Sequence, residues 1–159
     1  MLFELIKLGS TVTDSATATK CCVTHAYIRS DLSVCYQVKP KGLNKTSGAP
    51  LKGAWRSVAE LRDYETENRE IPAHILGETA KSTASGFIGV VSAITLHLNG
   101  CVHVDLAPKV RGKDGELRDW FDFSILEIEG KNIPKFDAAA REQAKQETPS
   151  PCAVERPSR

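Results

Sequence analysis

The sequence lacks several features that would mark a common functional class. Its net charge over 159 residues is only +1, so no strong overall field favours nucleic acid or an anionic membrane as a partner. No apolar run approaches the length of a membrane span. The five cysteines include no C-x-x-C pair, which argues against a disulfide framework or a structural zinc ribbon. We therefore expect a protein made in a reducing cytoplasm, without membrane or nucleic acid as its main partner.

Motifs for catalysis are missing as well. The chain has no G-x-S-x-G nucleophile elbow, no P-loop and no dinucleotide fingerprint. His97, Cys101 and His103 could share one strand face and leave a zinc ion with an open position, but a solvated polar face with a free thiol is the favoured interpretation. We expect no enzyme activity, no bound metal and no cofactor.

The strongest signal that is present is an internal repeat. Landmarks recur in order, first at an offset of 68 residues and, after a longer loop in the first copy, at an offset of 65. The matching pairs are Leu8-Gly9 with Leu76-Gly77, Pro40-Lys41 with Pro108-Lys109, and Trp55 with Trp120. The sequence therefore predicts two diverged copies of one small unit. We expect copy one at residues 1–63, a polar linker at 64–72, copy two at 73–129, and a short helix with an extended arm at 130–159.

Copy two contains a clear hairpin signature. Alternating β-branched residues flank Asn99-Gly100. A three-residue loop pairs Leu96 with Val102 and Ile94 with Val104, which gathers the apolar side chains on one face. About five short strands per copy predict an all-β protein made of two tandem small barrels of the SH3 or Tudor kind.

Two further expectations concern single positions. Leu32 occupies the position of Gly100 in the first copy, and a branched side chain is poor in a left-handed site, so the turn of the first copy is expected to differ. Trp55 and Trp120 are expected to be buried anchors, each closing one barrel.

Copy two also resembles a family of small tailed-bacteriophage proteins. The resemblance rests on Leu76-Gly77, residues 85–91, Leu98-Asn99-Gly100-Cys101, Pro108-Lys109, Asp114-Gly115 and Trp120-Phe121-Asp122. The ending Arg156-Pro157-Ser158-Arg159 is similar to the Pro/Ser/Arg endings of such proteins. The resemblance implies a phage origin and a small β-barrel, and it implies no reaction.

Charge is shared unevenly between the copies. Copy one has nine basic and five acidic residues, whereas residues 73–130 have five basic and eight acidic ones. Opposed charges fit head-to-tail packing between subunits of a homo-oligomer. They also fit a nucleic-acid face on copy one, formed by Lys39, Lys41, Lys45, Lys52 and Arg56. The residues expected to bind a partner are Lys39, Lys41, Lys45, Lys52, Arg56, Arg156 and Arg159.

These features together predict a non-enzymatic accessory protein of a phage virion. It would decorate or cement the head, neck or tail through protein–protein contacts with capsid or tail proteins. The alternative is a cytoplasmic phage factor that binds a host defence component, a signalling nucleotide or nucleic acid.

Overall fold

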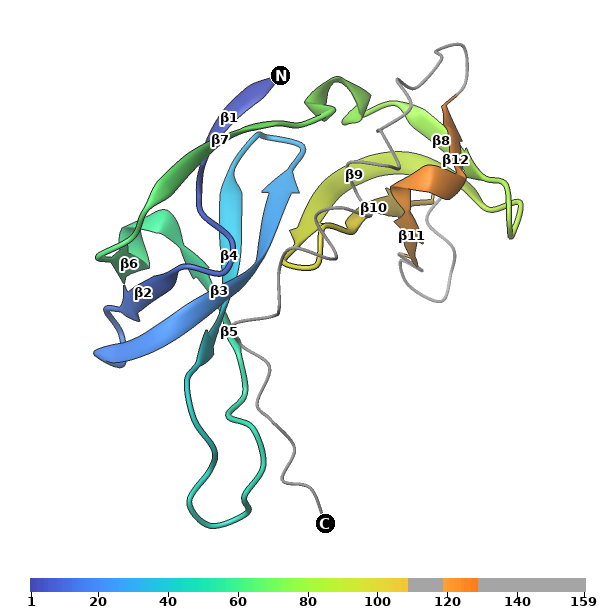
Figure 1. The fold of residues 1–159 in the computed structure, drawn as a ribbon. Coiled ribbons are helices and arrows are strands. Elements are labelled where there is room, and N and C mark those ends of the chain that lie inside the picture. The colour runs from blue at the N-terminus through green and yellow to red at the C-terminus, as the bar shows by residue number, and fades with distance from the viewer. Residues whose placement is uncertain (109–118, 129–159) are drawn as a thin grey trace.

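Strands and three short 3-10 helices make up the fold. The computed structural model describes residues 1–108 and 119–128 (Figure 1). The strands are β1 (Leu2–Ile6), β2 (Thr11–Asp14), β3 (Thr19–Arg29), β4 (Val34–Pro40), β5 (Ala54–Ser57), β6 (Leu61–Arg62), β7 (Thr66–Glu70), β8 (Thr79–Ser82), β9 (Ile88–His97), β10 (Val102–Ala107), β11 (Asp119–Asp122) and β12 (Leu126–Ile128). The 3-10 helices are η1 (Val58–Glu60), η2 (Ala73–Ile75) and η3 (Phe123–Ile125). The predicted all-β class is confirmed. The predicted arm at 130–159, with Arg156 and Arg159, lies outside the described residues.

The same series of strands occurs twice along the chain. In the first repeat, β2 to β6, strand β3 pairs with β2 and β4, β4 pairs with β5, and β6 returns to pair with β2. In the second repeat, β8 to β12, strand β9 pairs with β8 and β10, β10 pairs with β11, and β12 returns to pair with β8. A 3-10 helix precedes the last strand of each repeat. In both repeats the ladder is open, because its two outermost strands are not joined to each other.

The two repeats join edge to edge. Strands β3 and β9 pair antiparallel, and Tyr27 lies opposite Thr95 at the middle of the shared ladder. Because these two residues are also equivalent in the repeat, an approximate twofold axis passes between them. β1 pairs antiparallel with β7, a strand inside the segment expected as a linker, so the repeats are connected by two ladders (Figure 1).

The hairpin registers agree with the sequence prediction. Leu96 pairs with Val102 and Ile94 with Val104, and the equivalent residues of the first repeat pair in the same way. The inward side chains are buried and belong to one apolar cluster that spans both repeats. Tyr36 is part of this core, and its hydroxyl accepts a hydrogen bond from the backbone N–H of Ile6 at 3.1 Å.

The turns of the two hairpins are alike, which corrects the expectation that they differ. Leu32 adopts φ of 65° and its equivalent Gly100 adopts 81°. The N–H of Leu32 donates to the carbonyl of Arg29 at 2.9 Å, and the N–H of Gly100 donates to the carbonyl of His97 at 3.0 Å. The hairpin therefore holds Leu32 in a left-handed conformation despite its steric cost.

The expectation that both tryptophans are core anchors is wrong. Trp55 and Trp120 are each 48% exposed. Strand alternation explains why Trp120 in β11 faces outward. The adjacent Phe121 points inward, is 7% exposed and stacks on Phe87. Phe121 thus fills the core position that had been assigned to Trp120.

Candidate functional site

One face of the joined sheet carries aromatic and polar side chains. Six strands lie side by side in the order β5-β4-β3-β9-β10-β11, and their inward faces form the core. On the outward face, one row of paired residues runs across all six strands. The row is Ser57, Cys35, Tyr27, Thr95, His103 and Asp122. The twofold axis crosses this row at Tyr27 and Thr95, so the two repeats build the face jointly.

The two exposed tryptophans flank Tyr27. The ring centroid of Tyr27 lies 5.8 Å from that of Trp55 and 5.7 Å from that of Trp120. The interplanar angles are 60° and 58°, so neither indole is stacked on the tyrosine. The repeat alignment had matched Trp55 with Trp120 but placed both in the core. The strand register indicates that Trp120 faces outward, because Trp120 pairs with Asp105 and the hairpin puts Asp105 on the polar face.

A cleft of about 580 Å³ opens between these aromatic rings. We call it the aromatic cleft. Its lining residues are Tyr27, Arg29, Cys35, Trp55, Arg56, Ser57, Glu60 and Trp120. Trp120 comes from the second repeat and the others from the first, so the cleft exists only where the repeats meet. Its volume lies within the range of small-ligand pockets, about 300–1,000 Å³.

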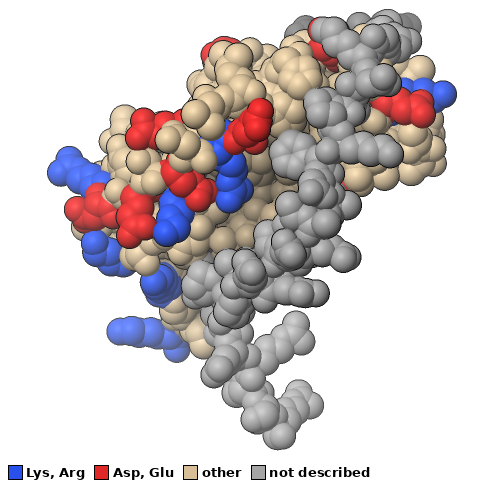
Figure 2. Space-filling model, turned by 45° about the horizontal axis from the view of Figure 1, so that its top comes forward, with Lys and Arg blue, Asp and Glu red and all other residues tan. Residues whose placement is uncertain are grey.

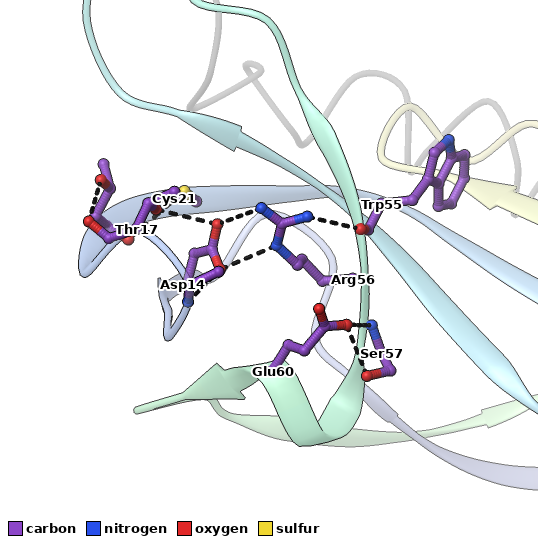
Figure 3. Close-up of polar contacts among 9 residues, drawn as sticks. Asp14, Thr17, Cys21, Trp55, Arg56, Ser57 and Glu60 are labelled. Atoms are coloured by element: carbon purple, nitrogen blue, oxygen red, sulfur yellow. Dashed lines mark hydrogen bonds and ion pairs between the residues drawn. The ribbon is translucent and has the colours of Figure 1, made fainter.

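An ion pair fixes one wall of the aromatic cleft (Figure 3). Arg56 donates from Nε and Nη2 to the two carboxylate oxygens of Asp14, which is 3% exposed, and from Nη1 to the backbone carbonyl of Trp55. The hydrogen bond from Arg56 lowers the pKa of Asp14 more than burial raises it. The pair therefore ties β5, an edge strand, to β2 and holds the backbone that carries Trp55.

The charges around the cleft are not equally available to a ligand. The Arg56 charge is neutralised by Asp14. Glu60 accepts hydrogen bonds from the backbone N–H and the hydroxyl of Ser57, each 2.8 Å long, in a capping box of η1. Arg29 is exposed and forms no ion pair within the described part of the chain. Among the described residues, Arg29 is therefore the cation of the cleft that stands outside an ion pair, while the Glu60 carboxylate keeps its negative charge and Asp31 lies near enough to interact with Arg29.

Three histidines form a contiguous group beside the aromatic cleft. The ring of His97 lies 4.4 Å from that of His25 and 4.3 Å from that of His103, measured between centroids. Burial, and then the proximity of His25 and His103, lowers the pKa of His97 to about 4, while Asp122 acts in the opposite direction. Burial also lowers the pKa of His25. His25 and His97 are therefore neutral at pH 7.

His97, Cys101 and His103 are the residues that the sequence offered as possible zinc ligands. Across residues 1–108 and 119–128, no three His, Cys, Asp or Glu side chains are placed to hold a metal ion. Cys101 is a free, half-buried thiol, as is Cys35. The arrangement of the histidines supports edge contacts between their rings.

A second surface is the loop between β4 and β5, which projects from the body of the molecule (Figure 1). We call residues 41–53 the basic loop, because they include three lysines and no acidic residue. Asn44 organises its tip: its side-chain oxygen accepts from the N–H groups of Thr46 and Ser47, and its carbonyl accepts from that of Gly48. The loop is therefore a structured projection, which lowers the entropy lost on binding.

The described residues among those expected to bind a partner lie on β4, the basic loop and β5. Lys41, Lys45 and Lys52 are exposed on the basic loop. Lys39 shares the outward face of β4 with Cys35 and Gln37, and Arg56 is held by Asp14. In Figure 2, Lys and Arg are interspersed with Asp and Glu at the end of the molecule that carries β2 and β6, without a broad patch of one sign.

Comparison of the chain with protein-family models, curated proteins and solved structures found no match. Among the residues that the structure describes, no helix is both long enough and apolar enough to cross a membrane. Function is therefore argued from the aromatic cleft and the basic loop.

Proposed function

We propose that this protein is a non-enzymatic accessory component of a tailed-phage virion and attaches to a neighbouring protein through its basic loop. The observation that carries the proposal is the loop itself. Lys41, Lys45 and Lys52 project on a structured hairpin without an acidic residue among them, and Leu43 adds an apolar contact that is 45% exposed. Such a projection suits an acidic, partly apolar patch on a capsid or tail protein.

We propose further that each repeat is a small barrel of the SH3 or Tudor kind. The support is a five-strand order in which the last strand returns to the first, with a 3-10 helix before it, in both repeats. Small β units of this kind often bind ligands through loops and aromatic side chains and carry no catalytic groups.

The setting follows from the resemblance of the second repeat to small phage proteins. In this setting the protein is made in the host cytoplasm and then decorates or cements the head, neck or tail. The C-terminal segment with Arg156 and Arg159 would add a second contact, and the protein could also assemble with copies of itself.

The test measures occupancy on phage particles assembled without the endogenous copy. The full-length protein should bind, and replacing Lys41, Lys45 and Lys52 by glutamine should reduce its occupancy several-fold at low salt. Raising the salt should reduce wild-type occupancy too, because exposed charges are screened over about 8 Å at physiological ionic strength. The matched control replaces Lys7, Lys20 and Lys81, which are exposed outside the loop, and should bind like wild type. Absence of the wild-type protein from particles would overturn the proposal.

A second candidate function is the cytoplasmic one, in which the protein binds a host defence component, a signalling nucleotide or nucleic acid. The aromatic cleft is the specific observation that favours it, because attachment through the basic loop leaves the cleft unused.

A further inference from the structure

We propose that the aromatic cleft binds a nucleotide, stacking a nucleobase on Trp55 or Trp120 and placing a phosphate against Arg29. This inference rests on the second candidate function and names its ligand class and site, and it is independent of virion attachment because the cleft and the basic loop are different surfaces. It assigns a ligand class to the place where the two repeats meet.

The tryptophans supply stacking surfaces. Each is 48% exposed, and each lies on a β-strand, which limits its freedom before binding. Both indoles meet Tyr27 at a steep angle, which leaves their faces unstacked by that ring. Every nucleobase has a π face, so exposed indoles of this kind bind bases with little dependence on sequence.

Arg29 gives the cleft a cationic group that can hold an anion. Arg56 is neutralised by Asp14, and Glu60 is bound to Ser57, whereas Arg29 has no ion-pair partner in the described chain. A guanidinium presents a planar fork of donors that matches phosphate oxygens. Aromatic rings together with a free arginine therefore fit a ligand that is both aromatic and anionic.

The same charge disfavours the main rival ligand of an aromatic site. A cage for a quaternary ammonium group uses aromatic faces to attract a cation. Arg29 at the lining would repel that cation, and the Glu60 carboxylate, the acidic group of the lining, is already engaged by Ser57. The volume, about 580 Å³, is sufficient for a ligand of one or two nucleotide units.

The test uses the purified full-length protein and four probes: adenosine monophosphate, cyclic di-AMP, a (dT)15 oligonucleotide and tetramethylammonium. Binding is followed by calorimetry and by quenching of tryptophan fluorescence. At least one nucleotide probe should bind. Tighter binding of either free nucleotide identifies a soluble nucleotide as the source of the ligand, whereas tighter binding of (dT)15 identifies single-stranded nucleic acid. Binding of tetramethylammonium alone, or of no probe, would overturn the inference.

Variants distinguish the cleft from the rest of the surface. At least one of Trp55→Ala and Trp120→Ala should weaken binding about tenfold, as expected for loss of a stacked base, and Trp→Phe at the same position should restore most of the affinity. Arg29→Gln should weaken binding and reduce its salt dependence. The control Ile88→Ala removes a side chain of equal exposure, 48%, outside the cleft, and should bind normally. Lys45→Gln should also bind normally, because it alters only the basic loop. Unchanged affinity in all three cleft variants would rule out this site, whatever the outcome of the particle experiment.

Discussion

Arg56 and Asp14, which are 42 residues apart in the chain, form a two-pronged ion pair with both hydrogen bonds 3.0 Å long. The pair bridges β2 and β5 on one side of the aromatic cleft. The second repeat has no counterpart, because Ser82 and Phe121 occupy the equivalent positions. One wall of the cleft is thus held by charge and the other by apolar packing.

Arg56→Met should destabilise the protein more than the loss of an exposed ion pair does, because it leaves the buried Asp14 carboxylate without its cation. Lys20→Met is the matched control, since it breaks an ion pair with Asp63 in which both side chains are more than half exposed. Such exposed pairs contribute about 0–1 kcal/mol. Urea denaturation of the two variants measures the difference, and equal losses would show that burial of Asp14 does not matter.

Acid should weaken this pair as well. The pKa of Asp14 is lowered in the folded protein, chiefly by Arg56, so its contribution is present above the ordinary value of 3.8 and is lost as the pH falls through the lower, folded value. Asp14→Asn should remove that part of the acid transition. Melting temperatures measured from pH 5 downward test this, and an unaltered slope in Asp14→Asn would contradict it.

Trp120→Ala and Phe121→Ala should differ greatly although the residues are neighbours. Trp120 is half-exposed, so its removal should cost less than about 1 kcal/mol, whereas Phe121→Ala should cost about 3–5 kcal/mol as a buried aromatic deletion. Thermal and chemical denaturation of both variants measure this. A large loss of unfolding free energy in Trp120→Ala would show that Trp120 is part of the core.

Leu32→Gly should stabilise the protein by about 0.5–1 kcal/mol. Leu32 is held at φ of 65° and is 45% exposed, so glycine relieves strain and removes little packing. The reciprocal change Gly100→Ala, in the equivalent turn, should destabilise by about 1 kcal/mol. The two free energies of unfolding should therefore move in opposite directions, and a loss in Leu32→Gly would show that its side chain makes a contact that outweighs the strain.

Stability should decline as the pH falls from about 6.5 to 4 because of His97. Its pKa is lowered from 6.5 to about 4, so below 6.5 the unfolded chain takes up a proton that the folded chain does not. After allowance for solvent near this half-buried ring, we expect a loss of about 1–2 kcal/mol across the window. His97→Gln should flatten the dependence, and His74→Gln, at an exposed site, should leave it unchanged. A His97→Gln variant with the wild-type pH profile would contradict the assignment.

Local patterns were sufficient to predict the hairpins. Alternation around Asn99-Gly100 admits one register with apolar side chains on a single face, and Leu96 and Val102 pair in that register. The repeat then placed the equivalent strands of the first copy.

No local sequence pattern predicts the contacts that build the aromatic cleft. In Trp120-Phe121 either aromatic residue could point inward, and only the pairing of Trp120 with Asp105 decides which one does. The Asp14–Arg56 pair depends on a returning strand, so no local spacing reveals it. The sequence does not predict the left-handed conformation of Leu32, because the steric cost of that conformation is smaller than the free energy gained from pairing the two strands that the turn connects.

The approximate twofold axis at Tyr27 and Thr95 has a consequence for how such a protein could arise. A chain with a single repeat could build a similar joined sheet only as a homodimer, and every feature on one side of the axis would then recur on the other. Fusion of the two halves removes that restriction. The twofold axis relates Arg29 of the first repeat to His97 of the second, and it relates Gln37 to Asp105. A covalent pair can thus recognise a ligand whose two ends differ chemically, which a strictly symmetric dimer cannot do at its axis.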